Sequence, residues 1–259
     1  MAAPGKHQEV EIVSRKDHAP DLWSVRVRAD PRPDYQSGQY VTLGVEEAGK
    51  VTERAYSLVS APHESELEFF FELVTGGALT PQLHLLQPGA RLLMRPRAKG
   101  VFTLDRESGH KNHLCVSTVT GVAPFVSMAR TLLREAEQGR TPAVRLVVLE
   151  AASRSWEFGY RDELSALAGR HPGWFTFVPS VSRPWEDEAW TGERGRAEDL
   201  VRKYLDGNGM EPGNTTAYVC GNPGMIDNAK GIFLRRGFSR EDLRIEVYWM
   251  PKKEKADGP

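Results

Sequence analysis

Cysteine is nearly absent from this chain, which has only Cys115 and Cys220 among its 259 residues. Two cysteines exclude a disulfide framework and a cluster held by four thiolates, and they are typical of a reducing compartment. No apolar run approaches the length of about 18 residues that a membrane span needs. Residues 1–8 lack the apolar core of a signal peptide. We therefore expect a cytoplasmic protein without a membrane segment.

A large excess of one charge is also missing. The formal net charge is -1, so no overall basic character indicates a nucleic-acid partner. The seven histidines show no metal-ligand spacing, and we predict no metal site. The G-x-S-x-G motif of many serine hydrolases and the G-x-G-x-x-G dinucleotide motif are both absent. These absences leave 40% hydrophobic and 27% charged residues, which is ordinary for a globular protein.

Short strands with turn residues between them fill the first half. Trp23, Val25 and Val27 alternate with polar residues, which is the period of a half-buried strand. Residues 41–45, 67–74 and 91–94 are further strand-like runs. Thr80 is expected to cap a short helix, with Pro81 as its first helical residue. This half predicts a small antiparallel β-barrel.

Strands and helices alternate after about residue 110. We predict strands at 113–117, 144–149, 174–181, 216–220 and 243–249, and helices near 125–136, 160–168, 197–205 and 225–236. Regular alternation of this kind favours a doubly wound parallel sheet. The chain is therefore expected to form two domains, a β-barrel and an α/β domain.

Two short motifs have the chemistry of adjoining nucleotide sites. Arg54-Ala55-Tyr56-Ser57 lies between two strand-like runs and offers a cation for a pyrophosphate, an aromatic face for a flavin, and a hydroxyl for a ring nitrogen. The second motif, Cys220-Gly221-Asn222-Pro223, offers a thiol and a tight turn where a second nucleotide can meet that ring. Together the motifs suggest hydride transfer between a nicotinamide and a flavin.

Other candidate residues lie where parallel strands are predicted to end, the edge at which open α/β sheets bind ligands. Thr120, Gly121 and Pro124 join a strand to a helix, and free N–H groups at such a turn favour an anion. Ser182, Arg183 and Arg196 suit a 2′-phosphate, because arginine matches phosphate geometry. An ordinary βα turn and solvated surface arginines are the alternative interpretations of these two groups.

These motifs, in this order, resemble the ferredoxin–NADP(+) reductases and their wider flavoprotein superfamily, over residues 8–249. Besides the two motifs above, Gly77-Ala78-Leu79-Thr80 looks like the second flavin segment, residues 120–125 look like the NADP pyrophosphate loop, and Glu246-Val247-Tyr248 resembles the ending of plant-type members. The resemblance implies an FAD-binding barrel at residues 1–108 and an NADP(H)-binding domain at 109–259.

The resemblance also implies roles for individual residues. In the FAD site it places Arg54 at the pyrophosphate, Tyr56 on one flavin face and Ser57 near N5, with Ala55, Leu73, Val74, Gly77, Leu79 and Thr80 around them. It implies that Cys220 and Glu246 flank the hydride-transfer point, that Tyr248 covers the other flavin face, and that Trp249 reaches the adenine. Gly221, Asn222 and Pro223 belong to the nicotinamide motif. Ser57, Cys220, Glu246 and Tyr248 are thus the expected catalytic residues.

The function implied is hydride transfer between NADP(H) and FAD, with single electrons exchanged with a transient ferredoxin or flavodoxin partner. We expect a monomer. The alternatives are a reductase component of an oxygenase system, a ferric-siderophore reductase, and a nucleotide-binding sensor or electron-transfer subunit. One departure stands out: Val119 occupies a position where most members have glycine, and a β-branched residue there restricts the backbone.

Overall fold

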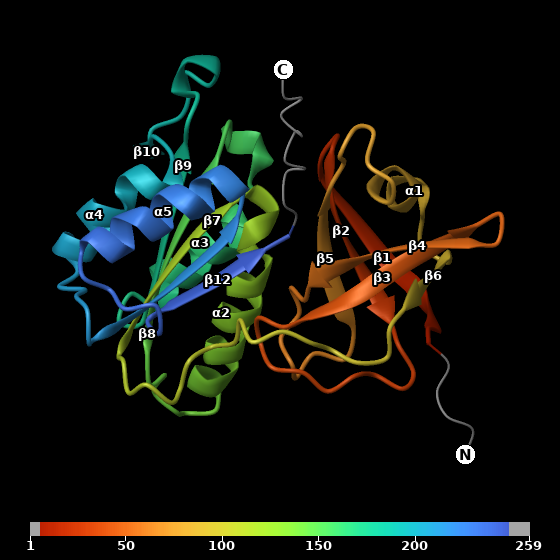
Figure 1. The fold of residues 1–259 in the computed structure, drawn as a ribbon, viewed down its shortest axis with the longest axis horizontal. Helices are drawn as coiled ribbons and strands as arrows, with labels where there is room; N and C mark the ends of the chain where they lie inside the picture. The colour runs from red at the N-terminus through yellow and green to blue at the C-terminus, as the bar shows by residue number, and fades with distance from the viewer. Residues whose placement is uncertain (1–5, 249–259) are drawn as a thin grey trace, which may run out of the picture.

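The computed structural model describes residues 6–248, and these form two sheets that lie side by side (Figure 1). The N-terminal sheet is antiparallel and barrel-like, and the C-terminal sheet is parallel and covered by helices on both faces. Both predicted fold classes are therefore confirmed.

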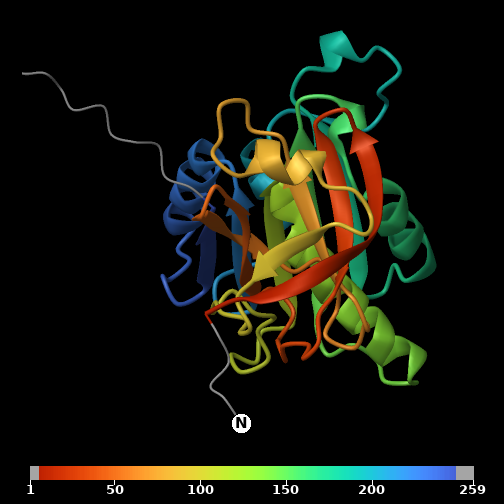
Figure 2. The same cartoon turned by 90° about the vertical axis from the view of Figure 1, so that its right-hand side faces the viewer.

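The barrel-like sheet has six strands. They are β1 (Gln8–Ala19), β2 (Leu22–Arg28), β3 (Tyr40–Glu47), β4 (Lys50–Ser57), β5 (Leu67–Glu72) and β6 (Arg91–Met94), with helix α1 (Thr80–Leu85) between the last two. Their order is β4-β3-β6-β1-β2-β5. Figure 2 shows the barrel from outside, with β1 crossing its front. Alternate side chains such as Val25, Leu43 and Phe69 form its core.

Two strands of this sheet differ from the sequence prediction. β1 was not predicted, although Val10 and Ile12 alternate inward, because the second half of the strand is polar and exposed. β4 contains the Arg54–Ser57 motif, which was predicted to lie between strands. Buried and exposed residues do not alternate clearly along β4. The strand forms because its backbone pairs with β3 in antiparallel register along its whole length. Backbone pairing with a distant partner is not visible in local periodicity.

The parallel sheet also has six strands, in the order β10-β9-β8-β7-β11-β12. They are β7 (Asn112–Thr118), β8 (Arg145–Ala152), β9 (Phe175–Val181), β10 (Glu193–Arg194), β11 (Thr215–Gly221) and β12 (Leu243–Val247). The helices are α2 (Ala123–Glu137), α3 (Arg161–Arg170), α4 (Ala197–Gly207) and α5 (Pro223–Arg235), with the short turns η1 (Val119–Val122), η2 (Ser155–Glu157) and η3 (Pro184–Glu186).

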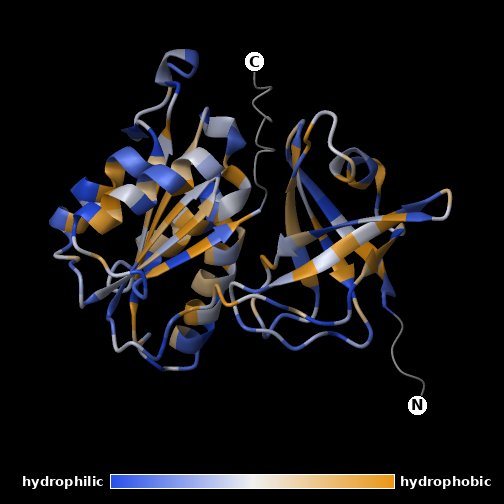
Figure 3. Cartoon of the chain, viewed as in Figure 1, coloured by the Kyte–Doolittle hydropathy of each residue, from blue (hydrophilic) through white to orange (hydrophobic). Residues whose placement is uncertain are grey.

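Two hydrophobic clusters cover the two faces of this sheet. α2 and α3 pack on one face, and α4 and α5 pack on the other, each through buried apolar residues. Figure 3 shows hydrophobic and hydrophilic residues along the same helices, with hydrophobic residues dominating the strands between them. The first cluster continues into the barrel through Leu22, Val59 and Phe70, so α2 is shared by both halves. Figure 1 shows α2 between the two sheets, and β12 running toward the barrel. The carboxyl edge of the parallel sheet therefore faces the end of β4.

Candidate functional site

The centre of the candidate site lies where the barrel meets the end of β12. The Ser57 hydroxyl, at the end of β4, donates a hydrogen bond of 2.9 Å to Glu246 Oε2, 189 positions away. The Tyr248 hydroxyl donates to Ser57 Oγ at 3.1 Å. Ser57 therefore accepts from one residue and donates to another, and it joins the two sheets through side chains.

Cys220 completes this group from the neighbouring strand. It is the second-to-last residue of β11, lies opposite Glu246 in parallel register, is fully buried, and belongs to the apolar cluster against which Tyr248 packs. The four expected catalytic residues, Ser57, Cys220, Glu246 and Tyr248, are thus brought together. Trp249, expected beside an adenine, lies outside the residues that the structure describes.

Burial controls the charges in this group. It raises the pKa of Glu246 to about 7, although the hydrogen bond from Ser57 acts in the opposite direction. Burial, and then the charge of Glu246, raises the pKa of the Cys220 thiol well above its usual value. The thiol is therefore neutral near pH 7, whereas Glu246 can hold or release a proton there.

The Arg54–Ser57 motif presents two different surfaces at the end of β4. Arg54 and Ala55 are exposed, and the Arg54 guanidinium donates to the Glu53 carbonyl at 2.7 Å. The Tyr56 ring is half-buried and meets Phe71 edge to face at 4.8 Å between ring centres. Among the described residues, no carboxylate is paired with Arg54. An exposed cation and a ring held at its edge fit the pyrophosphate and the flavin of FAD.

The second expected flavin segment forms a tight loop between β5 and α1. The Gly77 N–H donates to the Val74 carbonyl at 2.8 Å, and a Cβ on Gly77 would lie 2.9 Å from that oxygen. The Leu73 N–H donates to the Asp21 carbonyl at 2.8 Å, and Leu79 is buried in the barrel core. A side chain at position 77 would clash with the Val74 carbonyl, so the loop requires glycine there.

The capping role predicted for Thr80 is wrong. Leu79 is the N-cap of α1 and makes no side-chain capping bond, and Thr80 is the first helical residue. The Thr80 hydroxyl instead accepts from the Val74 N–H at 3.0 Å. That N–H lies just beyond β5 and would otherwise have no hydrogen-bond partner. The Thr80 hydroxyl therefore bonds to the loop before the helix and not to the first N–H groups of α1.

The two predicted nucleotide turns of the parallel sheet form one unit. A Cβ on Gly121 would lie 2.3 Å from the Cys220 carbonyl, and one on Gly221 would lie 2.3 Å from Thr118 Oγ1. Gly221 also has a φ of +133°, which glycine adopts without strain. The Asn222 N–H donates to Thr118 Oγ1 at 2.8 Å, which ties the turns together.

Helices α2 and α5 begin at these turns. The Asn222 side chain accepts from the N–H groups of Gly224 and Met225, and Pro223 lies in the first turn of α5, as the C-G-N-P motif requires. By contrast, the N-cap of α2 is Val122, without a side-chain bond, and Pro124 is in the first turn. The first N–H groups of α2 thus lack a side-chain cap, which suits an anion such as a pyrophosphate.

Val119 has an unusual backbone conformation in this turn. Its φ is +44°, in the left-handed region that a β-branched residue rarely adopts. Its side chain packs against the apolar cluster of Ala152, Phe158, Val181 and Trp190. The departure from glycine therefore gains apolar contact at the cost of backbone strain at the expected pyrophosphate turn.

The residues expected at a 2′-phosphate are only partly gathered. Ser182 and Arg183 follow β9, where Ser182 Oγ donates to the Ala152 carbonyl at 3.3 Å and Arg183 pairs with Glu186 at 3.6 Å. Arg196 precedes α4 and lines an open cavity of about 470 Å³ between α4 and α5. The two arginines therefore lie on different segments, one after β9 and the other before α4.

Arg154 is a further cation at this edge that sequence reasoning did not include among the site residues. It pairs with Glu157 at 3.1 Å and donates from Nε to Glu186 at 2.6 Å, and its guanidinium lies 5.8 Å from the Trp156 ring centre. The available signal was its place two residues after the end of β8, at the carboxyl edge of the parallel sheet. Glu186 thus holds both Arg154 and Arg183.

Within residues 6–248, no helix has the length and apolar character of a membrane span, and no cluster of histidine, cysteine and acidic residues is suited to a metal. These findings concern only the described part of the chain.

Comparisons with known proteins agree with this geometry. The family described as "Oxidoreductase NAD-binding domain" matches residues 116–231. The chain is 30% identical over 242 residues to "Ferredoxin--NADP reductase A" of Sorangium cellulosum, covering 88% of this chain and 83% of that protein. It is 29% identical over 244 residues to "Phenol 2-monooxygenase, reductase component DmpP" of Pseudomonas sp., covering 93% of this chain but 64% of that protein.

A solved structure is similar over almost the whole molecule. The ferredoxin NADP+ reductase from Neisseria gonorrhoeae, with bound FAD and NADP, matches with a TM-score of 0.80 and 26% identity. The match covers 95% of this chain and 100% of that one. The two-sheet architecture is therefore shared along the full length of that protein, and the family resemblance found in the motifs is confirmed.

Proposed function

The chain belongs to the ferredoxin–NADP(+) reductase family, and on that premise we propose that it is a flavoprotein oxidoreductase that moves hydride between NADP(H) and FAD. Its specific activity in this proposal is that of a ferredoxin–NADP(+) reductase, with a ferredoxin or flavodoxin as the one-electron partner. Residues 1–108 form the FAD domain and residues 109–259 the NADP(H) domain. We also propose that it is a cytoplasmic monomer.

One observation carries the proposal: Ser57 of the barrel is hydrogen-bonded to Glu246 and Tyr248 of the parallel sheet. Two nucleotides held by different sheets can meet only at such a junction. Bound FAD supplies a ring that accepts two electrons together and releases them singly. Ser57 orients the junction, and Glu246 holds or releases a proton at Oε2. Tyr248 and the buried Cys220 exclude water from it.

The remaining residues divide between the two nucleotides. Arg54 holds the FAD pyrophosphate and Tyr56 supports its ring, while the 73–80 loop approaches the nucleotide through its backbone. Turns 118–122 and 220–223 hold the pyrophosphate and nicotinamide of NADP(H). Ser182, Arg183 and Arg196 select the 2′-phosphate, with arginine as its matched donor.

The test is the cofactor content and reactivity of the purified protein. We expect a yellow protein that releases one FAD per chain on denaturation and reduces an artificial acceptor with NADPH. Arg54→Ala should lose FAD, whereas Arg91→Ala, which removes an exposed barrel arginine paired with Glu9, should keep it. A colourless protein that cannot be reconstituted with FAD contradicts the proposal, as does equal FAD loss in both variants.

A second candidate is the reductase component of an oxygenase system, favoured by the similarity to the phenol 2-monooxygenase reductase component. The chain spans only 64% of that relative and has two cysteines, so a separate iron–sulfur protein would have to carry electrons onward. Reduction of a purified ferredoxin or flavodoxin from the same host by NADPH supports the first candidate. Reduction only of an oxygenase component supports the second.

A further inference from the structure

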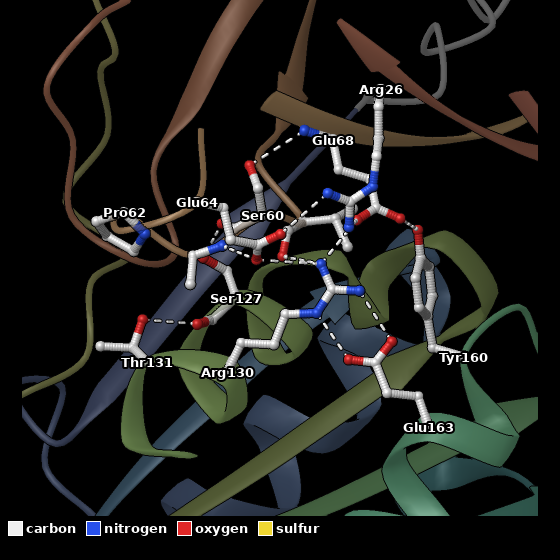
Figure 4. Close-up of polar contacts among 12 residues, drawn as sticks. Arg26, Ser60, Pro62, Glu64, Glu68, Ser127, Arg130, Thr131, Tyr160 and Glu163 are labelled. Carbon is white, nitrogen blue, oxygen red and sulfur yellow. Dashed lines mark hydrogen bonds and ion pairs between the residues drawn. The ribbon is translucent and has the colours of Figure 1, made fainter. Parts of the chain in front are cut away.

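A partly buried cluster of charged side chains joins the barrel to the α/β half away from the four central residues (Figure 4). Its centre is Arg130 on α2. Arg130 Nη1 lies 2.7 Å from Glu68 Oε2 and 3.4 Å from Glu64 Oε1, both on the barrel side. Its Nε and Nη2 pair with the two carboxylate oxygens of Glu163 on α3, at 2.7 and 2.8 Å. One guanidinium thus holds carboxylates from both halves of the molecule.

The barrel end of the cluster is held firmly. Glu68 is 5% exposed, and it also receives hydrogen bonds from Arg26 and from the Tyr160 hydroxyl, each at 2.8 Å. Burial opposes ionisation of Glu68, but Arg130 and Arg26 hold its pKa below the usual value. Charge-assisted bonds with little access to water restrain geometry more strongly than exposed ion pairs do.

Two further contacts connect this cluster to the candidate site. Ser127, one turn before Arg130 on α2, donates from its hydroxyl to the Ser60 carbonyl at 2.6 Å, and this contact is buried. Arg130 Nη1 also lies 3.5 Å from the Val59 carbonyl. Val59 and Ser60 lie two and three residues after Ser57 in the chain, so α2 is hydrogen-bonded to the segment that follows the site hydroxyl.

The other end of α2 belongs to the nucleotide turn. The helix begins at Ala123, immediately after η1. In η1, Gly121 lies so close to the Cys220 carbonyl that a Cβ on it would be 2.3 Å from the oxygen. A rigid helix therefore contacts Ser57's segment through Ser127 and Arg130, and it carries the expected pyrophosphate turn at its first residue. Movement of α2 relative to the barrel would displace one half of the site from the other.

We propose that Arg130 and Ser127 are positioning residues that set the distance between the flavin and nicotinamide sites by fixing α2 to residues 59–68 of the barrel. This inference rests on the proposed hydride transfer. Small displacements of reacting atoms slow such reactions strongly, on the order of 100-fold for about 1 Å. A positioning role therefore predicts slow hydride transfer in a protein that still binds both nucleotides.

The main experiment measures flavin reduction by saturating NADPH in a stopped-flow instrument. Arg130→Met should slow reduction about tenfold or more, while FAD content and the Kd for NADP(+) change less than about twofold. Arg130→Lys should recover part of the rate. A lysine ammonium keeps the positive charge, but it cannot bond to Glu68 and Glu163 at the same time with the fixed geometry of a guanidinium. Arg134→Met is the matched control: Arg134 lies one turn further along α2 and pairs within the helix with Glu137.

A second variant separates positioning from stability. Arg130→Met leaves Glu68 with fewer cations and is expected to lower the melting temperature. Adding Glu68→Gln removes this buried charge, which Arg26 alone then compensates, and should restore much of the stability, yet reduction should remain slow. Ser127→Ala, a small change expected to fold, should slow reduction in the same direction. Recovery of the rate together with the melting temperature would mean that the cluster only stabilises the fold.

Hydrogen exchange gives a readout that does not depend on activity. In Arg130→Met and Ser127→Ala, the amides of residues 58–60 should exchange faster than in the wild type, and Arg134→Met should leave them unchanged. Wild-type rates of both exchange and flavin reduction in all variants would overturn the proposal. If wild-type protein fails to reduce FAD with NADPH, the proposed function is wrong, and the exchange of residues 58–60 still decides whether α2 holds this segment.

Discussion

Glu246→Gln tests the electrostatics of the candidate site most directly. Glutamine has the shape of glutamate and keeps an acceptor for the Ser57 hydroxyl, but it cannot ionise. In the folded protein, burial raises the pKa of Glu246 to about 7 from an ordinary 4.5. The folded state therefore binds this proton more tightly than the unfolded chain does.

The stability difference should depend on pH in a defined way. Below about pH 4.5 the carboxyl is protonated in both states, so wild type and Glu246→Gln should be equally stable. Between about pH 4.5 and 7 the unfolded chain ionises while the folded protein does not, and wild type loses stability as the pH rises. Above pH 7 the variant should be more stable by about 3 kcal/mol, which follows from the gap between the two pKa values.

The assay is urea-induced unfolding of both proteins from pH 4.5 to 8.5. Glu241→Gln, which neutralises an exposed glutamate just before β12, is the matched control and should show no such trend. A difference between wild type and Glu246→Gln that stays constant with pH would refute the reasoning, because Glu246 would then ionise equally in both states.

The same titration should appear in catalysis. An ionised Glu246 beside a bound nicotinamide would stabilise the positive charge that develops on that ring as hydride leaves it. The rate of flavin reduction by NADPH should therefore rise as the pH increases through about 7 in wild type, and it should be nearly flat in Glu246→Gln.

Three other changes test the expected nucleotide contacts. Val119→Gly should relieve about 1–2 kcal/mol of backbone strain and tighten NADP(+) binding, whereas Val119→Ala should only destabilise; melting temperatures and dissociation constants check both, and equal destabilisation would mean that no strain is present. Arg183→Ala should raise the NADPH KM about tenfold or more and leave the NADH KM nearly unchanged, since a charged phosphate contact is worth about 1.5–3 kcal/mol; equal effects on both would refute the 2′-phosphate role. Tyr248→Ser should tighten NADP(+) and NAD(+) binding severalfold, because aromatic stacking of about 1 kcal/mol no longer competes with the nicotinamide; if neither dissociation constant falls, Tyr248 does not cover the flavin.

Local chemistry explains why much of the α/β half was predictable. Apolar residues repeat at helical spacing in α2, and Asn222 and Pro223 begin α5 as an N-cap and a first-turn proline should. Gly121 and Gly221 mark turns where another backbone lies too close for a side chain. These features depend on residues near one another in the chain, so the sequence alone reveals them.

The barrel was harder to predict because strand pairing is not local. β4 depends on β3 for its hydrogen bonds, and the polar half of β1 shows little alternation. Thr80 has the right residue type for a cap, but a strand end several residues earlier competes for its hydroxyl. The same sequence signal thus has two structural solutions, and tertiary context selects one of them.

The sequence by itself determined the order of the motifs, the two-domain architecture and the types of residue at the site. Only the tertiary structure decided that Ser57 meets Glu246 across 189 positions, that burial moves the Glu246 pKa into the neutral range, and that Arg130 is shared by carboxylates of both halves. The physical reason is that residue type and spacing are properties of the chain, whereas burial, charge pairing and the distance between sheets arise only when distant segments pack together.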